Sequence, residues 1–157
     1  MFFNCLPFAI GLLFATYTLA SGVTIAYDKR YDSAKTSVSK SACGKRLETF
    51  LGAHTYGSIP TFPQIGAADF ITHIDHPSCA TCGMLVHVDE EGTTHLINFL
   101  IMDRSTTAPF VLGKKAMDRL TGGQAEKLGR VNATFRQMPN SFCDKPIAMS
   151  MPLDECQ

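Results

Sequence analysis

Two apolar runs separated by a short polar break predict a β-hairpin in the middle of the chain. The first run covers residues 84–88, the second covers residues 96–102, and the polar break between them ends on Gly92. A short turn that contains glycine and joins two β-rich runs is typical of a hairpin. The second run is almost continuously apolar, which indicates a strand covered on both faces, as in a small closed barrel.

The rest of the pattern predicts more short strands and a few short helices. Residues 54–66 contain two prolines and two glycines, so we expect an ordered loop there. Burying about six short strands without long open edges favours a closed or nearly closed β-barrel. The expected strands outside the hairpin are 23–28, 70–72 and 131–138, and the expected helices are 46–50, 113–120 and a short one that ends at Gly129.

The first twenty residues differ in kind from the rest of the chain. They carry no charged side chain, their centre at residues 8–15 is apolar, and the short residues Thr18 and Ala20 precede Ser21. This pattern predicts a secretory signal peptide, residues 1–20, cleaved before Ser21. The alternative is an N-terminal membrane anchor, which needs about 20 apolar residues, whereas this run is shorter and is broken by polar residues.

Secretion determines how the cysteines are interpreted. The expected mature chain, residues 21–157, retains five of the six cysteines, and in an oxidising compartment these are most simply disulfide partners. Two alternatives involve Cys79 and Cys82: a redox-active pair, or a zinc site completed by His73 and His76. Zinc needs four well-placed ligands and no second ligand pair follows, so we favour two structural disulfides, each stabilising by about 2–4 kcal/mol.

Four cysteines allow three disulfide connectivities, and a fifth, Cys156, stands apart near the C-terminus. An unpaired cysteine in a secreted protein indicates either an intermolecular bond or a free thiol. We therefore expect a monomer or a dimer linked through Cys156.

The composition restricts the classes of partner. With 157 residues the chain is long enough for one ordinary domain, and 14 basic residues balance 14 acidic ones. Phosphate binding needs a basic surplus, so we expect no nucleic-acid partner. A neutral ligand such as a carbohydrate fits this balance better.

Five segments carry a recognisable pattern: residues 23–32, 55–66, 77–82 and 120–135, together with Asp103 at the end of a strand. With four cysteines in the matching order, the chain closely resembles the cerato-platanin family of small secreted fungal proteins. The resemblance covers a domain at 21–143 and implies a mainly β fold, a six-stranded double-ψ β-barrel with one or two short helices, similar to the first domain of expansins and to one group of endoglucanases. It also implies the disulfides Cys43–Cys79 and Cys82–Cys143.

The chain departs from the family pattern in two places. Gly83 and Met84 follow Cys82 where family members often carry an aromatic residue, and the sequence contains no tryptophan. The C-terminal tail, residues 144–157, extends past the usual end of the family.

Asp103 is the principal candidate for chemistry. In the related barrel endoglucanases the matching residue is the proton donor, but glycoside hydrolysis normally needs a second carboxyl group. Four aspartates are candidates for that role only by residue type, so we predict that the protein is not an enzyme and needs no cofactor or metal. The alternative for Asp103 is a structural carboxylate that accepts backbone N–H groups or pairs with Arg104. The four aspartates are Asp28, Asp69, Asp75 and Asp89.

We predict that carbohydrate contacts Asp103 together with Tyr27, Tyr56, Gly57 and Gln124. The tyrosines offer ring faces and hydroxyl groups, and the Gln124 amide can bond sugar hydroxyls; packing roles for the tyrosines are the alternative. Three further expectations concern other side chains. Asn98 is expected to make hydrogen bonds inside the barrel, Asn132 begins a glycosylation sequon, and His54, His73, His76, His87 and His95 are expected at the surface.

Three functions follow as hypotheses. The first is a secreted, non-catalytic cell-wall protein that binds chitin or N-acetylglucosamine oligomers or loosens cellulose, as expansins do, and that a plant receptor perceives as an elicitor. The second is a surface-active structural protein that self-assembles at interfaces. The third is a weak endoglucanase.

Overall fold

The computed structural model describes residues 22–152, so the predicted signal peptide and Cys156 lie outside the described part of the chain. The strands are β1 (Gly22–Tyr27), β2 (Ile65–Ala68), β3 (Thr81–Val88), β4 (Thr94–Arg104), β5 (Phe110–Leu112), β6 (Arg130–Met138) and β7 (Ala148–Met151). The helices are α1 (Gly44–Leu51), α2 (Lys114–Leu120) and α3 (Ala125–Leu128), and four short 3₁₀ turns are η1 (Lys29–Asp32), η2 (Val38–Lys40), η3 (Tyr56–Ser58) and η4 (Asn140–Cys143).

Six strands close into a barrel, as expected. They follow the order β2-β5-β1-β6-β3-β4, and β4 pairs back onto β2 to complete the ring. Two pairs are parallel, β1 with β5 and β2 with β4, and the other pairs are antiparallel. Because the ring is closed, its six strands bury their apolar faces without leaving a long open edge.

The predicted hairpin is confirmed and forms the longest pair in the barrel. Residues of β3 and β4 pair from Thr81 with Ile101 to Val88 with Thr94. The turn is held by Asp89, whose Oδ1 accepts the Thr93 N–H at 2.7 Å.

Aromatic side chains fill the barrel interior. The ring centroids of Phe110 and Phe135 lie 4.5 Å apart, and Phe99 meets Phe110 edge-on at 5.5 Å. Gly83 on β3 leaves room for these rings, because a Cβ atom there would stand 2.6 Å from Phe135 and 2.8 Å from Phe99. Gly83 therefore has no side chain because the rings of Phe99 and Phe135 occupy the space that one would fill.

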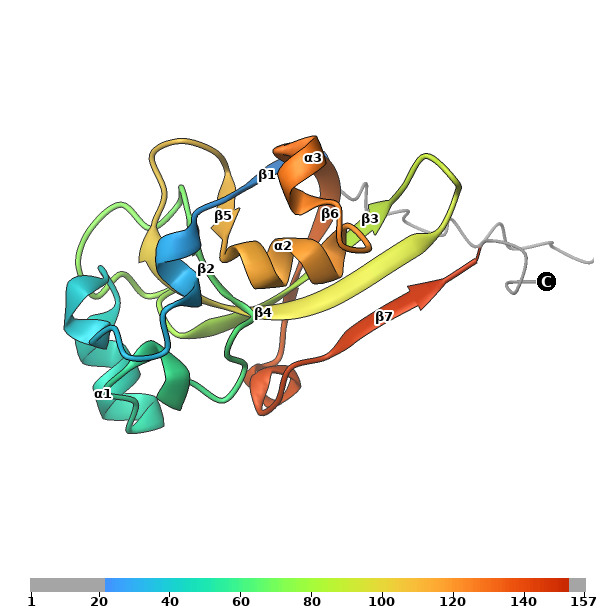
Figure 1. Cartoon of the computed structure of the whole chain (residues 1–157). Helices are drawn as coiled ribbons and strands as arrows, with labels where there is room; N and C mark the ends of the chain where they lie inside the picture. The colour runs from blue at the N-terminus through green and yellow to red at the C-terminus, as the bar shows by residue number, and fades with distance from the viewer. Residues whose placement is uncertain (1–21, 153–157) are drawn as a thin grey trace, which may run out of the picture.

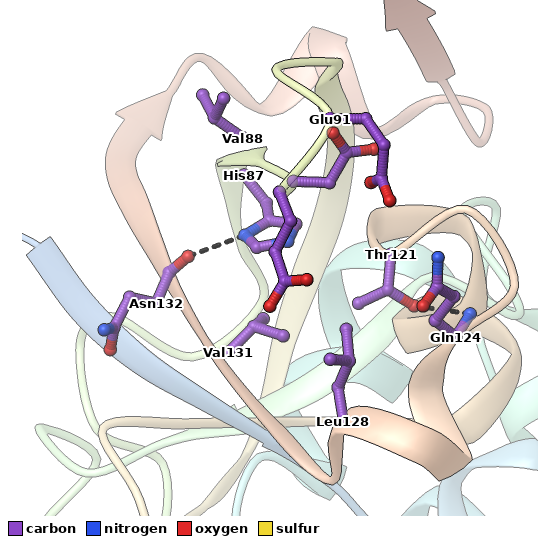
Figure 2. A pocket seen from close by; sticks show the side chains of 10 residues that line it. His87, Val88, Glu91, Thr121, Gln124, Leu128, Val131 and Asn132 are labelled. Atoms are coloured by element: carbon purple, nitrogen blue, oxygen red, sulfur yellow. Dashed lines mark hydrogen bonds between the residues drawn. The ribbon is translucent and has the colours of Figure 1, made fainter.

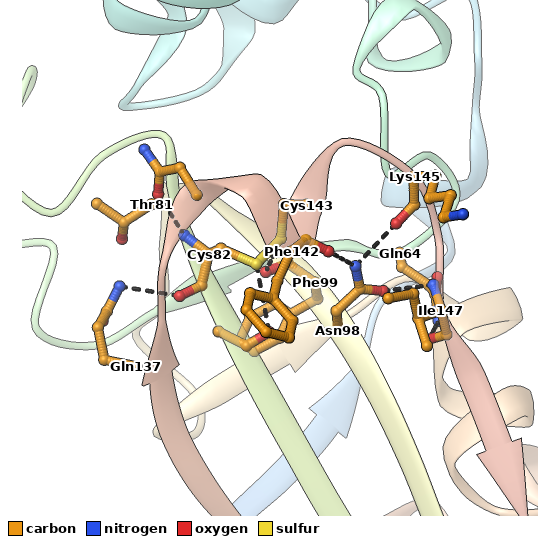
Figure 3. Close-up of a disulfide and its surroundings, with 12 residues drawn as sticks. Gln64, Thr81, Cys82, Asn98, Phe99, Gln137, Phe142, Cys143, Lys145 and Ile147 are labelled. Carbon is orange, nitrogen blue, oxygen red and sulfur yellow. Dashed lines mark hydrogen bonds between the residues drawn. A yellow bond between two sulfur atoms is a disulfide. The ribbon is translucent and has the colours of Figure 1, made fainter.

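Both implied disulfides are present, Cys43–Cys79 and Cys82–Cys143. They exclude the redox pair and the zinc site, since neither Cys79 nor Cys82 is free. The first ties the start of α1 to the segment before β3, and the second ties β3 to η4 (Figure 3).

The C-terminal tail contributes a seventh strand. β7 lies antiparallel along β4, where Leu96 pairs with Met149, and the two run side by side in Figure 1. Figure 3 shows how Asn98 and Gln64 face the chain that leads into it: Asn98 Nδ2 donates to the carbonyl oxygens of Phe142 and Lys145, and Gln64 Nε2 donates to that of Ile147 at 2.7 Å. The expected internal hydrogen-bonding role of Asn98 is thus confirmed.

The predicted helices and the last strand are confirmed, whereas the prediction for two other strands was wrong or incomplete. The helices near residues 46–50 and 113–120, the short helix before Gly129 and the strand at 131–138 are confirmed. The strand expected at 70–72 is instead β2, at Ile65–Ala68, and β5 was not expected. Small residues fill β2 because it is buried between β4 and β5, so it lacks the bulky β-branched pattern that identifies most strands.

Within residues 22–152, no helix is both long enough and apolar enough to cross a bilayer.

Candidate functional site

Asp103 lies at the end of β4, where the strand leaves the barrel. Its Oδ1 accepts the backbone N–H groups of Ala42 and Arg104, each at 2.8 Å, and its Oδ2 accepts the hydroxyl of Tyr31 at 2.9 Å. The side chain is 13% exposed. The carboxylate therefore joins three separate segments and still reaches the surface at one side.

Arg30 covers this exposed side. Its Nη2 stands 3.6 Å from Asp103 Oδ2, and its Nε stands 3.3 Å from Asp28 Oδ2. The guanidinium group also lies 4.7 Å from the ring centroid of Tyr31. One arginine thus bridges two carboxylates and rests on an aromatic ring, while its side chain remains 57% exposed and open to a ligand.

Both tyrosines beside Asp103 have raised pKa values. For Tyr31 and Tyr56, burial is the larger cause and the negative charge of Asp103 is the next. Each hydroxyl consequently keeps its proton and can donate a hydrogen bond over the whole physiological pH range.

Three adjoining cavities form one groove around these residues. The largest, about 840 Å³, contains Arg30, Asp103 and Arg104 in its walls. A second of about 350 Å³ shares Arg30 and Asp103 and is bounded by Tyr56. A third of about 370 Å³ shares Arg30 and Arg104 and is bounded by Tyr27. We call this surface the Asp103 groove.

The groove brings together three of the five predicted carbohydrate-binding residues. Asp103, Tyr56 and Tyr27 all line it. Gly57 is the neighbour of Tyr56 in η3, and it packs against Ala34, whose Cβ would stand 2.8 Å from a Cβ at that position. It supports the Tyr56 segment and lines none of the three cavities described here.

Gln124 lies in a different cavity, at the other end of β4 (Figure 2). This cavity, about 260 Å³, is bounded by the hairpin turn, by α3 and by the start of β6. Its polar walls include Asp89, Glu90 and Glu91, and its apolar walls include Leu128. Sequence reasoning had grouped Gln124 with Asp103; the structure separates them.

His95 corrects a second expectation. It is buried, with 4% of its surface exposed, whereas it was expected at the surface. Its Nε2 lies 2.8 Å from Asp89 Oδ2, and its Nδ1 lies 2.8 Å from Ser150 Oγ on β7. The pairing explains the burial, because both ring nitrogens have a partner. The hydrogen bond from His95 lowers the pKa of Asp89.

No group of three or more His, Cys, Asp or Glu side chains within residues 22–152 has the geometry of a metal site. His73 and His76 do lie together, with ring centroids 4.9 Å apart. Asn132, which begins the glycosylation sequon, is exposed on β6.

The partners of Asp103 were not identified from the sequence. Arg30 and Tyr31 follow β1 in a segment that was expected to be a loop, and Tyr31 is 72 residues away from Asp103. Of the structural alternatives considered for Asp103, acceptance of backbone N–H groups is confirmed, whereas its ion pair is made by Arg30 and Arg104 contributes only its backbone N–H. The available signal was a run of three charged residues followed by an aromatic one, Asp28-Lys29-Arg30-Tyr31.

Comparison with known proteins places this sequence and fold among relatives. The family described as Cerato-platanin matches residues 23–145. The heat-stable 19 kDa antigen of Coccidioides immitis is 30% identical over 149 residues, which span 91% of this chain and 98% of that protein. The crystal structure of cerato-platanin 2 from M. perniciosa is 33% identical, with a TM-score of 0.72, and covers 78% of this chain and 98% of its own. The solution structure of the fungal elicitor Cerato-Platanin is 29% identical, with a TM-score of 0.63, over 78% of this chain and 97% of its own.

Proposed function

The chain belongs to the cerato-platanin family, and on that premise we propose that it is a secreted protein that binds cell-wall oligosaccharides in the Asp103 groove without hydrolysing them. The ligands proposed are chitin or N-acetylglucosamine oligomers, or cellulose that binding would loosen. The observation that carries the proposal is the Asp103 carboxylate itself, fixed by three hydrogen bonds and accessible beside Tyr56.

The lining of the groove suits a sugar chain. Tyr27 and Tyr56 line two different cavities that share Arg30, and aromatic rings contribute apolar surface with a hydroxyl at the edge. Sugar hydroxyls need both donors and acceptors, and short hydroxyl side chains supply both. Those that line the three cavities are Ser33, Thr36, Thr72, Ser105, Thr106 and Thr107.

Binding without hydrolysis follows from how the carboxylates are used. A glycosidase needs one carboxyl group to donate a proton and another to attack or to activate water. Asp28 and Asp103 are connected through Arg30, because both carboxylates pair with its guanidinium group. That arrangement supports a binding site in which neither group is free to act as the base.

An elicitor role is proposed on similarity alone. The related Cerato-Platanin is described as a fungal elicitor, so we extend to this chain the proposal that plant tissue perceives it through a receptor. Secretion is supported by the two disulfides and by the predicted signal peptide.

A second candidate function, self-assembly at interfaces, is favoured by one observation. On the outer face of the barrel Val86, Leu96 and Met149 form one cross-strand row on β3, β4 and β7. Val88 and Met151 lie in the next row on the same face, on either side of Thr94, and both are exposed. An apolar sheet face of this kind suits adsorption to an apolar surface.

The proposal is tested by calorimetric titration of the chain from Ser21 onward with a chitin hexamer. Asp103→Asn keeps the shape of the side chain but removes its charge, so we expect a loss of affinity of about fivefold or more. Gln124→Ala is the matched control in the separate cavity and should leave affinity unchanged. Equal affinities for Asp103→Asn and the unmodified chain would contradict the proposal, and so would an absence of binding at millimolar hexamer.

A further inference from the structure

The Asp103 groove is positively charged although the chain as a whole is neutral. Four basic side chains line its three cavities, against the two carboxylates Asp28 and Asp103. The full sequence has equal numbers of acidic and basic residues. The four basic residues are Arg30, Lys40, Arg104 and Arg130.

The charges within the groove are not equivalent. Both carboxylates are already paired with Arg30, so they leave the other cations without an acidic partner. Among residues 22–152, Lys40, Arg104 and Arg130 form no ion pair. Arg104 and Arg130 donate instead to the carbonyl oxygens of Thr72 and Thr107, and all three residues are exposed.

The three unpaired cations are spread along the groove. Lys40 lines the central cavity and the one bounded by Tyr56, Arg104 lines the central cavity and the one bounded by Tyr27, and Arg130 lines only the one bounded by Tyr27. Spaced cations along a groove suit a polymer with a negative charge on successive units, because each unit can approach one cation.

We propose that the Asp103 groove binds an acidic polysaccharide, one built of uronic acids, in preference to a neutral one. This inference rests on the proposed function, since it names the class of glycan that the same groove takes. Each uronate carries one carboxylate for a lysine or arginine and hydroxyl groups for the tyrosine, serine and threonine side chains.

A nucleic acid fits the groove less well. Its affinity comes from a large number of phosphate contacts, which a chain of zero net charge with three free cations in the groove does not provide.

The test compares three oligosaccharides of equal length by calorimetry: oligogalacturonate, its fully methyl-esterified form and a chitin oligomer. We expect oligogalacturonate to bind about fivefold more tightly than its ester, and we expect the difference to shrink as salt rises from about 50 to 300 mM. The double variant K40Q/R104Q should lose about fivefold in affinity for oligogalacturonate, and it should lose less affinity for the methyl ester, which carries no charge for these two cations to bind. Arg136→Gln, which changes an exposed arginine on β6 outside the groove, is the control and should change neither.

Equal affinity for oligogalacturonate and its ester would overturn the inference, as would an unchanged affinity in the double variant. Binding of chitin without binding of oligogalacturonate would overturn it while leaving the proposed function intact, whereas binding of neither would remove both the inference and the proposed binding of chitin. Tighter binding of a single-stranded oligonucleotide of the same charge would also overturn it, because the groove would then select phosphate.

Discussion

Asn98 is joined to the backbone of Ile147 by two hydrogen bonds, one through its side chain and one through its own backbone. Asn98 Oδ1 accepts the N–H of Ile147 at 2.6 Å, and the backbone N–H of Asn98 donates to the carbonyl oxygen of Ile147 at 3.2 Å. The family match ends at residue 145, so this link attaches to the barrel a segment that lies beyond the matched region. Gln64 and His95, both buried, add hydrogen bonds to the same segment.

Replacing Asn98 should loosen this attachment. Asn98→Ala leaves two carbonyl groups and one N–H of the 142–147 segment without their side-chain partner, which should lower the free energy of unfolding by about 1–3 kcal/mol. Hydrogen exchange should rise most strongly at the amides of β7. Asn132→Ala, an exposed asparagine on β6, is the control. Unchanged exchange in β7 would show that Asn98 does not hold the tail.

The pairing of His95 with Asp89 predicts a loss of stability in acid. The hydrogen bond from His95 lowers the pKa of Asp89 below its ordinary value of 3.8. The stability that the pairing contributes is therefore fully present above about pH 4 and is lost as pH falls through the lower pKa of the folded state. Thermal midpoints measured between about pH 2 and 6 should fall less steeply for Asp89→Asn than for the unmodified chain. Identical slopes would contradict this, and the exposed Asp144→Asn serves as control.

Tyr31 should ionise late and should report on Asp103. Burial first, and then the Asp103 charge, raise its pKa above the ordinary value of 10.0. The folded state keeps the proton where the unfolded state loses it, so this contribution to stability is present below pH 10 and declines as pH rises further. Asp103→Asn should lower the pH at which Tyr31 forms tyrosinate, measured by ultraviolet absorbance and assigned with Tyr31→Phe. No change in the titration would mean that the Asp103 charge does not act on Tyr31.

Much of the fold could be predicted because its strongest pattern is local. The hairpin of β3 and β4 follows from two apolar runs and one turn, and α2 and α3 follow from short helical segments with Gly129 at the end. The disulfide pairing came from the family resemblance, since spacing alone left three connectivities open. β7 was not predicted, because its four residues are too few and too weakly β-forming to stand out, and its attachment depends on Asn98 and Gln64 on distant parts of the chain.

The candidate site could be predicted only in part for a similar reason. Asp103 was found because it ends a recognisable strand, but its partners Arg30 and Tyr31 come from a turn far away in the sequence. Gln124 was grouped with Asp103 by residue type, and only the closed barrel shows that they lie at opposite ends of β4. Which side chains meet depends on how the barrel closes, because closure brings together residues that are far apart in the sequence, and no local sequence pattern predicts it.

Gly83 should tolerate no side chain. The Cβ of Gly83→Ala would stand 2.6 Å from a carbon of Phe135 and 2.8 Å from one of Phe99, so the interior rings would have to shift. We expect a loss of about 1–3 kcal/mol in the free energy of unfolding, measured by urea denaturation. Gly22→Ala on β1, where the added Cβ meets nothing within 4 Å, should be close to neutral. Equal stabilities for the two variants would contradict this description of the core.

The central claim is that sugar binds in the Asp103 groove. The most direct test is to map which residues the ligand affects. We would follow backbone amide shifts by NMR while titrating the chain from Ser21 onward with a chitin hexamer. The account predicts saturable shifts centred on Ala42, Tyr56, Asp103 and Arg104, with Gln124 and its cavity unaffected. Shifts centred on Gln124, or no saturable shifts at millimolar ligand, would contradict it.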